Sequence, residues 1–580
     1  MACHTSLSDV RPSLALSPQL AHAHSQAGVL IVSFTDGRGS PTAVNWARSL
    51  SSLSLTALIG LTGPIGPREL SDLRSTGVGL FCADGKMAQL DSPSGRWEQL
   101  ARLLFFGLDV LCSDADIAWL RSPLPYLARV KRAHPLLDVA LTSDRVTLDF
   151  SATPLPARSL DLSSRQHDLE LEDALTFKTP SYNVGVVMLY SGSSPGSART
   201  MASMLRAWSR ACILSAPTAK LRVHSWAQGP INTKVLTPEI RRHPSDALLA
   251  HVFDGQLSLG VLPSLQFVTA LTYFAFEKRR AELGVRPFCL HAIFSHGRSP
   301  LRKLWIMRQA NAWHDPPPYY SASRFLDYYP ASQRGQIRAQ GGFRLVEAEI
   351  LEFRAAVRLA IALNRSLILP RRDLSLRSKS GLAHRFPWSL STLSLLTPHL
   401  TQHRLRCGDT VMAFPCFAWY HKMFHPATAK FNLWRLPMPE HCPVHYWLDV
   451  AAADSLPVGI REPSFLSNPR TPPELLSNRA ELTLTRSHSQ PRDGRIRLTT
   501  EGELVRALAQ RNEGLLRLRG LELFAGNFFG SKPGYTYHTR RLLHLGAVLR
   551  VTGYLELTSL IILCFDSRQI FYPPIHESRR

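Results

Sequence analysis

Short apolar runs that alternate with helical stretches most constrain the fold of the first part of this 580-residue chain. Val29–Phe34 is an apolar run that ends at Thr35-Asp36-Gly37, as a buried parallel strand does where it enters a loop. A helical stretch around Asn45–Arg48 follows, and then a second apolar run, Leu55–Leu61. Strand, helix and strand in this order predict the opening of a nucleotide-binding α/β sheet.

The same alternation continues and defines the expected domains. Trp97–Phe106 is predicted to be helical, and Val139–Asp144 and Val184–Leu189 to be strands. The aromatic, Pro-rich segment Asp315–Tyr320 is typical of a boundary. Beyond it, a helix over 347–364 that runs into the strand Ser366–Pro370 predicts a second α/β domain. We therefore expect a disordered leader over 1–27, an α/β domain over 28–330, and a smaller α/β domain over 331–580 that is poorly defined after about 475.

The composition is that of a globular protein with a strong positive charge. The formal net charge of +23 allows a basic protein that binds nucleic acid or another polyanion. Arg is scattered through apolar and polar segments alike, and no dense Lys/Arg run is interleaved with aromatic residues, so nucleic acid is not the partner we expect. The nine Cys include no CxxC pair, which leaves a zinc ribbon or a thioredoxin-like site unsupported.

Targeting signals are hard to find in this sequence. No apolar run reaches the roughly 18 residues that span a bilayer, and the N-terminus lacks the features of a signal peptide. Either the protein is soluble, or this sequence has lost an N-terminal anchor. The glycosylation sequon Asn364-Arg365-Ser366 lies in an apolar stretch, where we expect it to be buried, so it supports secretion only weakly.

An acidic pair, Asp114-Ala115-Asp116, ends an apolar run. Residues two apart in an extended chain point to the same side, so both carboxylates are expected to face one ligand beyond the carboxyl end of a strand. A divalent ion held there would bridge the diphosphate of a nucleotide sugar and stabilise its departure. The pair alone is equally compatible with a solvated turn, because a chain of this length contains about one Asp-x-Asp by chance.

The surrounding sequence favours the first interpretation. Phe106–Leu127 closely resembles the donor-site motif of the plant and algal nucleotide-diphospho-sugar transferase family, and most of all the arabinosyltransferases that extend hydroxyproline-linked arabinose chains on extensins. The resemblance continues in one register over about 28–475. Its further matches are Asp138–Asp144, Tyr182–Gly185, Asp254-Gly255, Leu259–Pro263, Tyr273-Phe274, His291, Lys303, Asp315–Pro317, Tyr319-Tyr320, Ala362–Pro370, Cys442-Pro443 and Arg461–Pro469.

The resemblance implies a GT-A fold for the first domain, a manganese or magnesium ion, a UDP-sugar donor, retention of anomeric configuration, and a Golgi location. Its implied metal ligands are Asp114, Asp116 and His291, although a core histidine would fit position 291 as well. The donor site that the resemblance implies consists of Asp114, Asp116, Asn183, Gly185 and Lys303, although a solvated lysine would fit position 303 as well. The catalytic residues that it implies are Gln228 and Asn232.

Three positions depart from the family pattern. The family's Trp-Asp-Gln is Trp226-Ala227-Gln228 here, so a carboxylate that could act as nucleophile or stabilise an oxocarbenium-like state is missing. A family Lys before the donor strand is Arg96, and the family's Ser-Gly-His is Thr269-Ala270-Leu271.

Three functions follow from these observations. The first is an active glycosyltransferase that moves a sugar, expected to be arabinofuranose, from a UDP-sugar to a hydroxyproline-rich glycoprotein or other cell-wall glycan acceptor. The second, prompted by Ala227, is a catalytically impaired relative that binds nucleotide sugar or glycan. The third is a basic polyanion-binding protein.

Overall fold

The chain forms two compact units in the computed structural model. Residues up to 307, together with 312–314, make the first unit, and residues 308–311 and those from 315 onward make the second. The structure describes residues 15–37, 39–83, 94–144, 168–175, 182–192, 196–215, 228–236, 240–293, 300–321, 324–329, 352–353, 355–370, 444, 450–485, 496–497, 501–519 and 521. Within these ranges, no helix combines the length and apolar character needed to cross a membrane.

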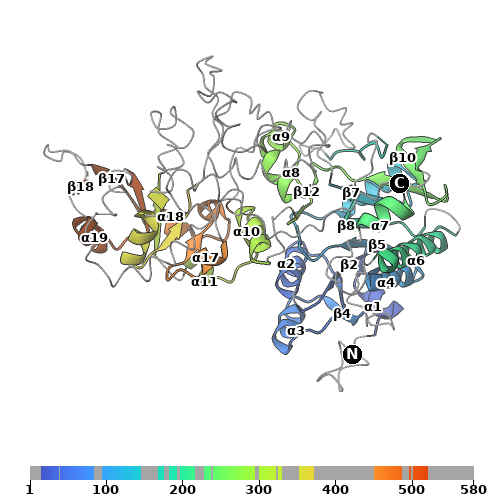
Figure 1. The fold of residues 1–580 in the computed structure, drawn as a ribbon, viewed down its shortest axis with the longest axis horizontal. Helices are drawn as coiled ribbons and strands as arrows, with labels where there is room; N and C mark the ends of the chain where they lie inside the picture. The colour runs from blue at the N-terminus through green and yellow to red at the C-terminus, as the bar shows by residue number, and fades with distance from the viewer. Residues whose placement is uncertain are drawn as a thin grey trace, which may run out of the picture. The chain divides into compact units, whose positions relative to one another are not determined.

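A large mixed sheet organises the first unit (Figure 1). Its path is β4-β3-β2-β5-β8-β7-β11-β10-β9. The segment from β4 to β5 is parallel, whereas β8 runs antiparallel to both of its neighbours, β5 and β7. The strands are β2 (Val29–Thr35), β3 (Leu58–Leu61), β4 (Gly79–Cys82), β5 (Asp109–Ser113), β7 (Val139–Ser143), β8 (Tyr182–Leu189), β9 (Arg241–His243), β10 (Asp246–Val252) and β11 (Leu257–Val261).

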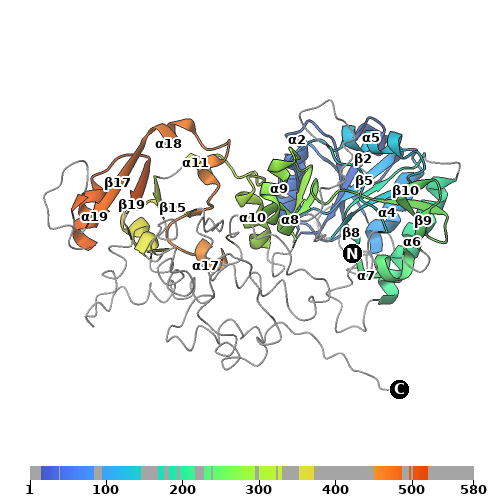
Figure 2. The same cartoon turned by 90° about the horizontal axis from the view of Figure 1, so that it is seen from above.

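Helices cover both faces of this sheet, which is why its central strands are apolar on both sides. On one face, α4 and α6 pack with Leu30 and Val110 into one core, whereas on the other face α2, α3 and α5 pack with Ile31 and Leu111 (Figures 1 and 2). Alternate residues of one strand therefore enter different cores. The helices of the unit are α2 (Ser40–Ser51), α3 (Pro67–Arg74), α4 (Ser94–Leu104), α5 (Leu124–Ala133), α6 (Ser197–Ser215), α7 (Gln228–Pro230), α8 (Ala270–Ala275), α9 (Glu277–Glu282) and α10 (Pro300–Gln309), with a π-helix at Ile231–Val235.

The expectation of a disordered leader over 1–27 is wrong for residues 15–27. Helix α1 (Pro18–Ala23) begins at Ser17, whose side chain accepts a hydrogen bond from the amide of Leu20. Strand β1 (Ser25–Gln26) then pairs with β2, and Leu16 and Ala21 are buried in the core beside α4. One buried leucine, one buried alanine and one capping serine are too weak a pattern to predict helix α1 and strand β1 from the sequence.

A small sheet, β12-β13-β6, brings distant segments together. It contains β6 (Ile117–Trp119), β12 (Phe267–Thr269) and β13 (Cys289–His291). β13 pairs antiparallel with β6 so that His291 lies opposite Ile117, and the amide of Ala292 donates to the carbonyl of Asp116. Thr269 caps α8 through a reciprocal pair of bonds with Thr272, while Leu271, at a position where the family has a polar residue, is buried.

The second unit is built on a parallel sheet of order β16-β15-β14-β19-β17-β18 (Figure 2). Its strands are β14 (Phe325–Tyr328), β15 (Ser366–Ile368), β16 (Ile460–Arg461), β17 (Arg479–Thr485), β18 (Ile496–Arg497) and β19 (Leu515–Arg519). Its helices include α11 (Pro318–Ser321), α17 (Val450–Asp454), α18 (Pro473–Ser477) and α19 (Glu501–Ala509), with a 3-10 turn, η7 (Phe465–Ser467). The α/β class expected for both parts of the chain is thus confirmed.

Three expectations about the second unit need correction. A boundary at 330 is too late, because β14 pairs with β15 and β19 and therefore belongs to the second unit. The region after 475 is also better defined than expected, since α19 leads into β19 at the centre of the sheet. The third correction concerns the sequon, which was expected to be buried. Asn364 is exposed, with a φ of 50°, in the turn before β15, although Arg365 and Ser366 are buried.

Candidate functional site

The acidic pair follows β5 at the carboxyl end of the parallel part of the sheet. The amide of Asp114 donates to the carbonyl of Gly185 at 2.8 Å, and the amide of Ile117 donates to the carbonyl of Asp114 at 3.2 Å, which closes a tight turn around the pair. Asp114 and Asp116 each offer a carboxylate oxygen within 4.8 Å of a nitrogen of His291 and of one another. The structure therefore brings together the three residues expected to bind a metal.

His291 reaches this turn through the pairing of β13 with β6. Its Nε2 lies 3.2 Å from Oδ1 of Asp116 and 3.7 Å from Oδ2 of Asp114. This nitrogen is buried and has no hydrogen-bond partner among the described residues. Burial lowers the pKa of His291, but the nearby charges of Asp116, Asp114 and Asp144 outweigh it and raise the pKa above its usual value. The ring nitrogen that faces both carboxylates is the one through which an imidazole would join them as a metal ligand, so the geometry fits that role.

Two cations flank the acidic pair. Nζ of Lys303, on α10, lies 2.6 Å from Oδ2 of Asp116, and Nη1 of Arg96, on α4, lies 2.7 Å from Oδ1 of Asp114. Burial would raise the pKa of Asp116, but the charges of His291 and Lys303 prevail and lower it well below its usual range. Asp116 is therefore ionised at neutral pH, as a metal ligand must be. Lys303 is a paired lysine at the site and not a solvated one.

A third carboxylate, which the sequence reasoning did not assign to the site, belongs to Asp144 at the end of β7. Its Oδ1 accepts from Nδ2 of Asn183 at 2.6 Å, and its Oδ2 accepts from Nε2 of Gln228 at 2.5 Å. Burial raises the pKa of Asp144, although both amides and His291 act against it. A β-bulge between β7 and β8 at Leu141/Thr142 aligns Thr142 with Asn183 and so directs this end of the sheet toward the acidic pair.

The amides expected in the donor and catalytic positions mainly hold this carboxylate in place. Asn183 is buried, and its Oδ1 also accepts from the amide of Gly185 at 2.7 Å. Asn232 accepts from the amide of Tyr182 and donates to the carbonyls of Tyr182 and Gln228. These bonds make Asn232 a positioning residue for Gln228. Ala227 lies outside the described residues.

Gly185 has a steric reason to be glycine. A Cβ at this position would lie 2.2 Å from Cε1 and 2.4 Å from Nδ1 of His291. Any larger residue would push the imidazole away from the acidic pair, so this glycine makes room for the histidine. The expected contact of Gly185 with a donor remains a prediction.

A divalent cation fits this set of side chains. Two carboxylates and one imidazole are ligands that manganese accepts, and carboxylate oxygens also suit magnesium. Nε2 of His291 faces an oxygen of each aspartate, at 3.2 Å and 3.7 Å, and these three groups are the ones that would hold the cation.

Comparison with known proteins identifies this region. Residues 94–304 match the sequence model of the nucleotide-diphospho-sugar transferase family. The matched stretch is about a third of the chain, and it is similar to this family. The match includes Arg96, the acidic pair, Asp144, His291 and Lys303, so every charged group of the site lies inside the matched stretch. The order and direction of the strands confirm the α/β class expected for the first unit.

A curated relative of this chain is the arabinosyltransferase XEG113 of Arabidopsis thaliana. The two are 26% identical over 374 residues, which cover 61% of this chain and 52% of the relative. The chain thus spans about half the length of the curated relative that it matches.

Solved structures similar to the transferase include three glycosyltransferases. The bifunctional glycosyltransferase WbbM is 13% identical, with a TM-score of 0.29, over 50% of this chain and 48% of WbbM. Mouse xyloside xylosyltransferase 1 is 11% identical, with a TM-score of 0.25, over 47% of this chain and 99% of the mouse protein. The galactosyltransferase LgtC is 12% identical, with a TM-score of 0.26, over 50% of this chain and 99% of LgtC.

Proposed function

We propose that this protein is a metal-dependent glycosyltransferase that takes its sugar from a UDP-sugar. The observation that carries the proposal is the placement of Asp114, Asp116 and His291 within 4.8 Å of one another inside the family's transferase domain. This edge of the sheet, beyond the carboxyl ends of parallel strands, is where open α/β folds bind nucleotides.

In this proposal, different side chains bind the metal ion and the diphosphate of the donor. Asp114, Asp116 and His291 would hold a manganese or magnesium ion, which supplies positive charge to the diphosphate leaving group. Lys303 and Arg96 bring two further positive charges to the same edge, and these would attract the donor and stabilise the charge that develops as UDP leaves. Asp114, 28% exposed, is the more accessible of the two aspartates.

Asp144 is the carboxylate that we assign to the sugar side of the reaction. Gln228 and Asn183 fix both of its oxygens, so its orientation is set before a donor binds. A carboxylate held in this way can stabilise positive charge on the sugar ring or attack the anomeric carbon. It therefore supplies the chemistry whose loss was inferred from Ala227, with Gln228 in a supporting role.

The proposed donor sugar is taken from the name of the relative, and the proposed acceptor from the family resemblance of the sequence. Because XEG113 is named an arabinosyltransferase, we propose arabinofuranose as the sugar and a hydroxyproline-rich glycoprotein or another cell-wall glycan as the acceptor. Retention of configuration is part of this proposal, and proton NMR of the product's anomeric signal would test it. We also propose a Golgi location, which a fluorescent fusion of the full-length protein would test.

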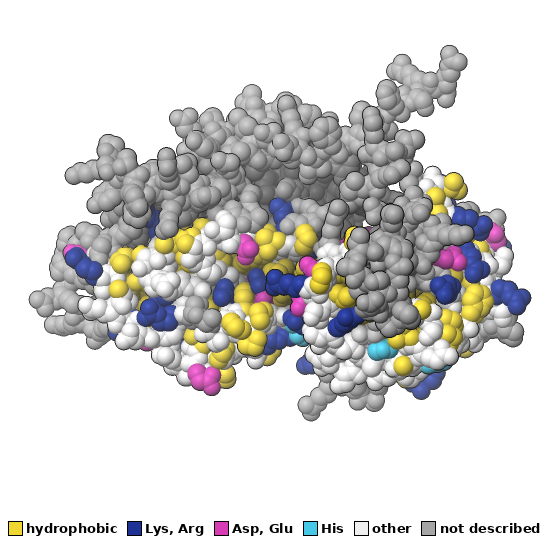
Figure 3. Space-filling view, turned by 90° about the horizontal axis from the view of Figure 1, so that it is seen from below, with side chains coloured by type: hydrophobic (Ala, Val, Ile, Leu, Met, Phe, Trp, Pro, Cys, Tyr) yellow, Lys and Arg dark blue, Asp and Glu magenta, His cyan; other side chains and the backbone are white. Residues whose placement is uncertain are grey.

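Two other functions compete with this one. A catalytically impaired relative that only binds nucleotide sugar is favoured by Ala227 alone, and metal-dependent UDP binding without sugar transfer would support it. A basic polyanion binder needs a continuous positive surface. On the face that Figure 3 shows, the Lys and Arg side chains of the described residues are instead interspersed with hydrophobic and uncharged side chains.

The deciding experiment compares Asp116→Asn with the wild type. UDP release from UDP-arabinofuranose is measured with manganese and a hydroxyproline-rich peptide, and we expect the variant to be about 100-fold slower, because a buried metal ligand is lost. Chelation with EDTA should abolish wild-type turnover, and added manganese should restore it.

The matched control is Asp173→Asn, which makes the same change in a carboxylate that pairs with Arg242 outside the site. This variant should turn over at the wild-type rate. Equal UDP release from Asp116→Asn and the wild type would show that Asp116 does not serve the reaction.

A further inference from the structure

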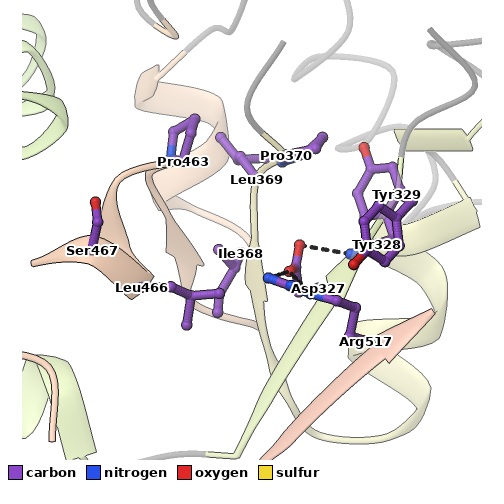
Figure 4. Close-up of a pocket in the computed structure, with 10 residues that line it drawn as sticks. All are labelled: Asp327, Tyr328, Tyr329, Ile368, Leu369, Pro370, Pro463, Leu466, Ser467 and Arg517. Atoms are coloured by element: carbon purple, nitrogen blue, oxygen red, sulfur yellow. Dashed lines mark hydrogen bonds and ion pairs between the residues drawn. The ribbon is translucent and has the colours of Figure 1, made fainter. Parts of the chain in front are cut away.

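The second unit contains a pocket of its own at the carboxyl edge of its parallel sheet. Its volume is about 320 Å³, near the lower end of the range for small-molecule sites. The ends of β14, β15 and β19 and the residues that follow β16 line it (Figure 4). Ligands of open parallel sheets bind at this edge, in a crevice where neighbouring strands separate.

Such a separation occurs between β14 and β15. Their pairing ends at Leu326 and Leu367, whereas β14 stays paired with β19 as far as Tyr328 and β15 stays with β16 as far as Ile368. The amides of Phe325 and Tyr329 bond on the β19 side, so the amide of Tyr328 faces β15. This amide donates to Oδ1 of Asp327 at 2.8 Å. The pocket is thus an opening in the sheet itself.

The charges in this pocket are balanced. Among the described residues that line it, Asp327 and Arg517 are the charged ones. Oδ2 of Asp327 accepts from Nε of Arg517 at 2.7 Å and from Nη2 at 2.6 Å. An anionic ligand that approached Arg517 would lie beside the Asp327 carboxylate and be repelled, whereas a neutral ligand meets no such penalty.

The remaining lining suits a ligand with hydroxyl groups on an apolar ring. A hydroxyl donates and accepts at once, so it can bridge a carboxylate and a guanidinium. Pro370, Pro463 and Leu466 supply apolar surface for the C–H face of such a ring. Tyr329 is held in place by the guanidinium groups of Arg517 and Arg519, 5.3 Å and 3.9 Å from its ring centroid.

We propose that this pocket binds a small neutral carbohydrate. The binding is separate from the donor reaction of the first unit and goes beyond the proposed transferase activity. Neither a divalent ion nor UDP is required for it, because the pocket's carboxylate is already paired with an arginine.

Titration of the full-length protein with neutral trisaccharides (arabinotriose, xylotriose and cellotriose) would test the proposal, using calorimetry and saturation-transfer NMR. At least one of them should bind, with or without EDTA. Ser467, an exposed residue on the pocket wall, offers a blocking site: Ser467→Trp should weaken binding at least tenfold by filling the pocket.

Ser477→Trp is the matched control. Both serines are exposed, and each donates from Oγ to the carbonyl three residues before it, but Ser477 does not line the pocket. The control should bind like the wild type, and melting temperatures would show that both variants fold. Asp116→Asn should also keep full trisaccharide binding, so this result is independent of whether the transferase proposal holds.

Three outcomes would overturn the proposal. One is that no neutral trisaccharide binds, and another is that Ser467→Trp binds as well as the wild type. The third is that UDP, or a trisaccharide of uronic acids, binds in a manner that Ser467→Trp abolishes and Asp116→Asn does not. That last result would show a site for anions in the second unit.

Discussion

The two units place different chemistry at the same structural position, the carboxyl edge of a sheet. In the first unit, the carboxylates of Asp114, Asp116 and Asp144 lie around His291, and the first two pair with Arg96 and Lys303. In the second unit, a single guanidinium, that of Arg517, contacts one carboxylate oxygen of Asp327 through two of its nitrogens. An excess of carboxylate favours a divalent ion and a diphosphate, whereas a matched pair favours an uncharged ligand. The balance of charge, more than the fold, separates the two inferred functions.

Asp144→Asn is the substitution expected to show this difference most strongly. It removes the carboxylate on the sugar side while keeping the shape of the side chain, so turnover should fall by about 100- to 1,000-fold. The affinity for UDP with manganese should change little, because Asp144 is not among the three clustered ligands. Trisaccharide binding in the second unit should not change.

Steady-state kinetics and UDP titration would separate these effects. Thr142→Val serves as a control because it alters a neighbour that bonds to Asn183 without removing a charge. If Asp144→Asn loses UDP affinity and turnover in the same proportion, Asp144 belongs to the metal and diphosphate site and the assignment to the sugar side is wrong.

Local sequence patterns predicted the part of the site that lies in one segment. An apolar run that ends in Asp114-Ala115-Asp116 is enough to place two carboxylates after a buried strand. Lys303 lies 187 positions from Asp116 in the sequence, so local patterns could not place it at the site, and it was named through the family resemblance. The bonds of Asp144 were not predicted, because only the folded sheet brings Gln228 and Asn183 to it. The sequence did predict a strand that ends at Asp144, and this was the available sign that its carboxylate lies at the same edge of the sheet as the acidic pair.

The second unit was harder to predict for the same reason. The helix and strand around Ser366 follow from local periodicity, as expected. Asp327 and Arg517, however, are 190 positions apart, and each taken alone is an ordinary charged residue near the end of a strand. Neither the pocket nor its charge balance can be inferred from the sequence around either residue. Helix α1 was missed because, within it, Ala21 is buried in the core and Leu20 only partly buried against it.

Gly185→Ala should have an intermediate effect, confined to the first unit. The added Cβ would lie 2.2 Å from the His291 ring, so the imidazole has to move away from the acidic pair. We expect about tenfold weaker manganese binding and about 1–3 kcal/mol lower stability from the overpacking. Calorimetry with manganese and chemical unfolding would measure the two effects. Gly192→Ala, where a Cβ meets nothing within 4 Å, is the control. Unchanged manganese affinity in Gly185→Ala would mean that His291 is not a ligand.

The same replacement, Arg to Lys, should have the smallest effects and should differ between the units. Arg96 touches Asp114 through Nη1 alone, and the family carries Lys at this position, so Arg96→Lys should slow turnover only about two- to fivefold. Arg517 uses both Nε and Nη2 on Asp327, which one ammonium group cannot reproduce. Arg517→Lys should therefore lower the stability of the second unit by about 1 kcal/mol and weaken trisaccharide binding. If both variants behave alike in unfolding and in ligand binding, the two arginines do not differ in role, and the contrast between a charged and a balanced edge fails.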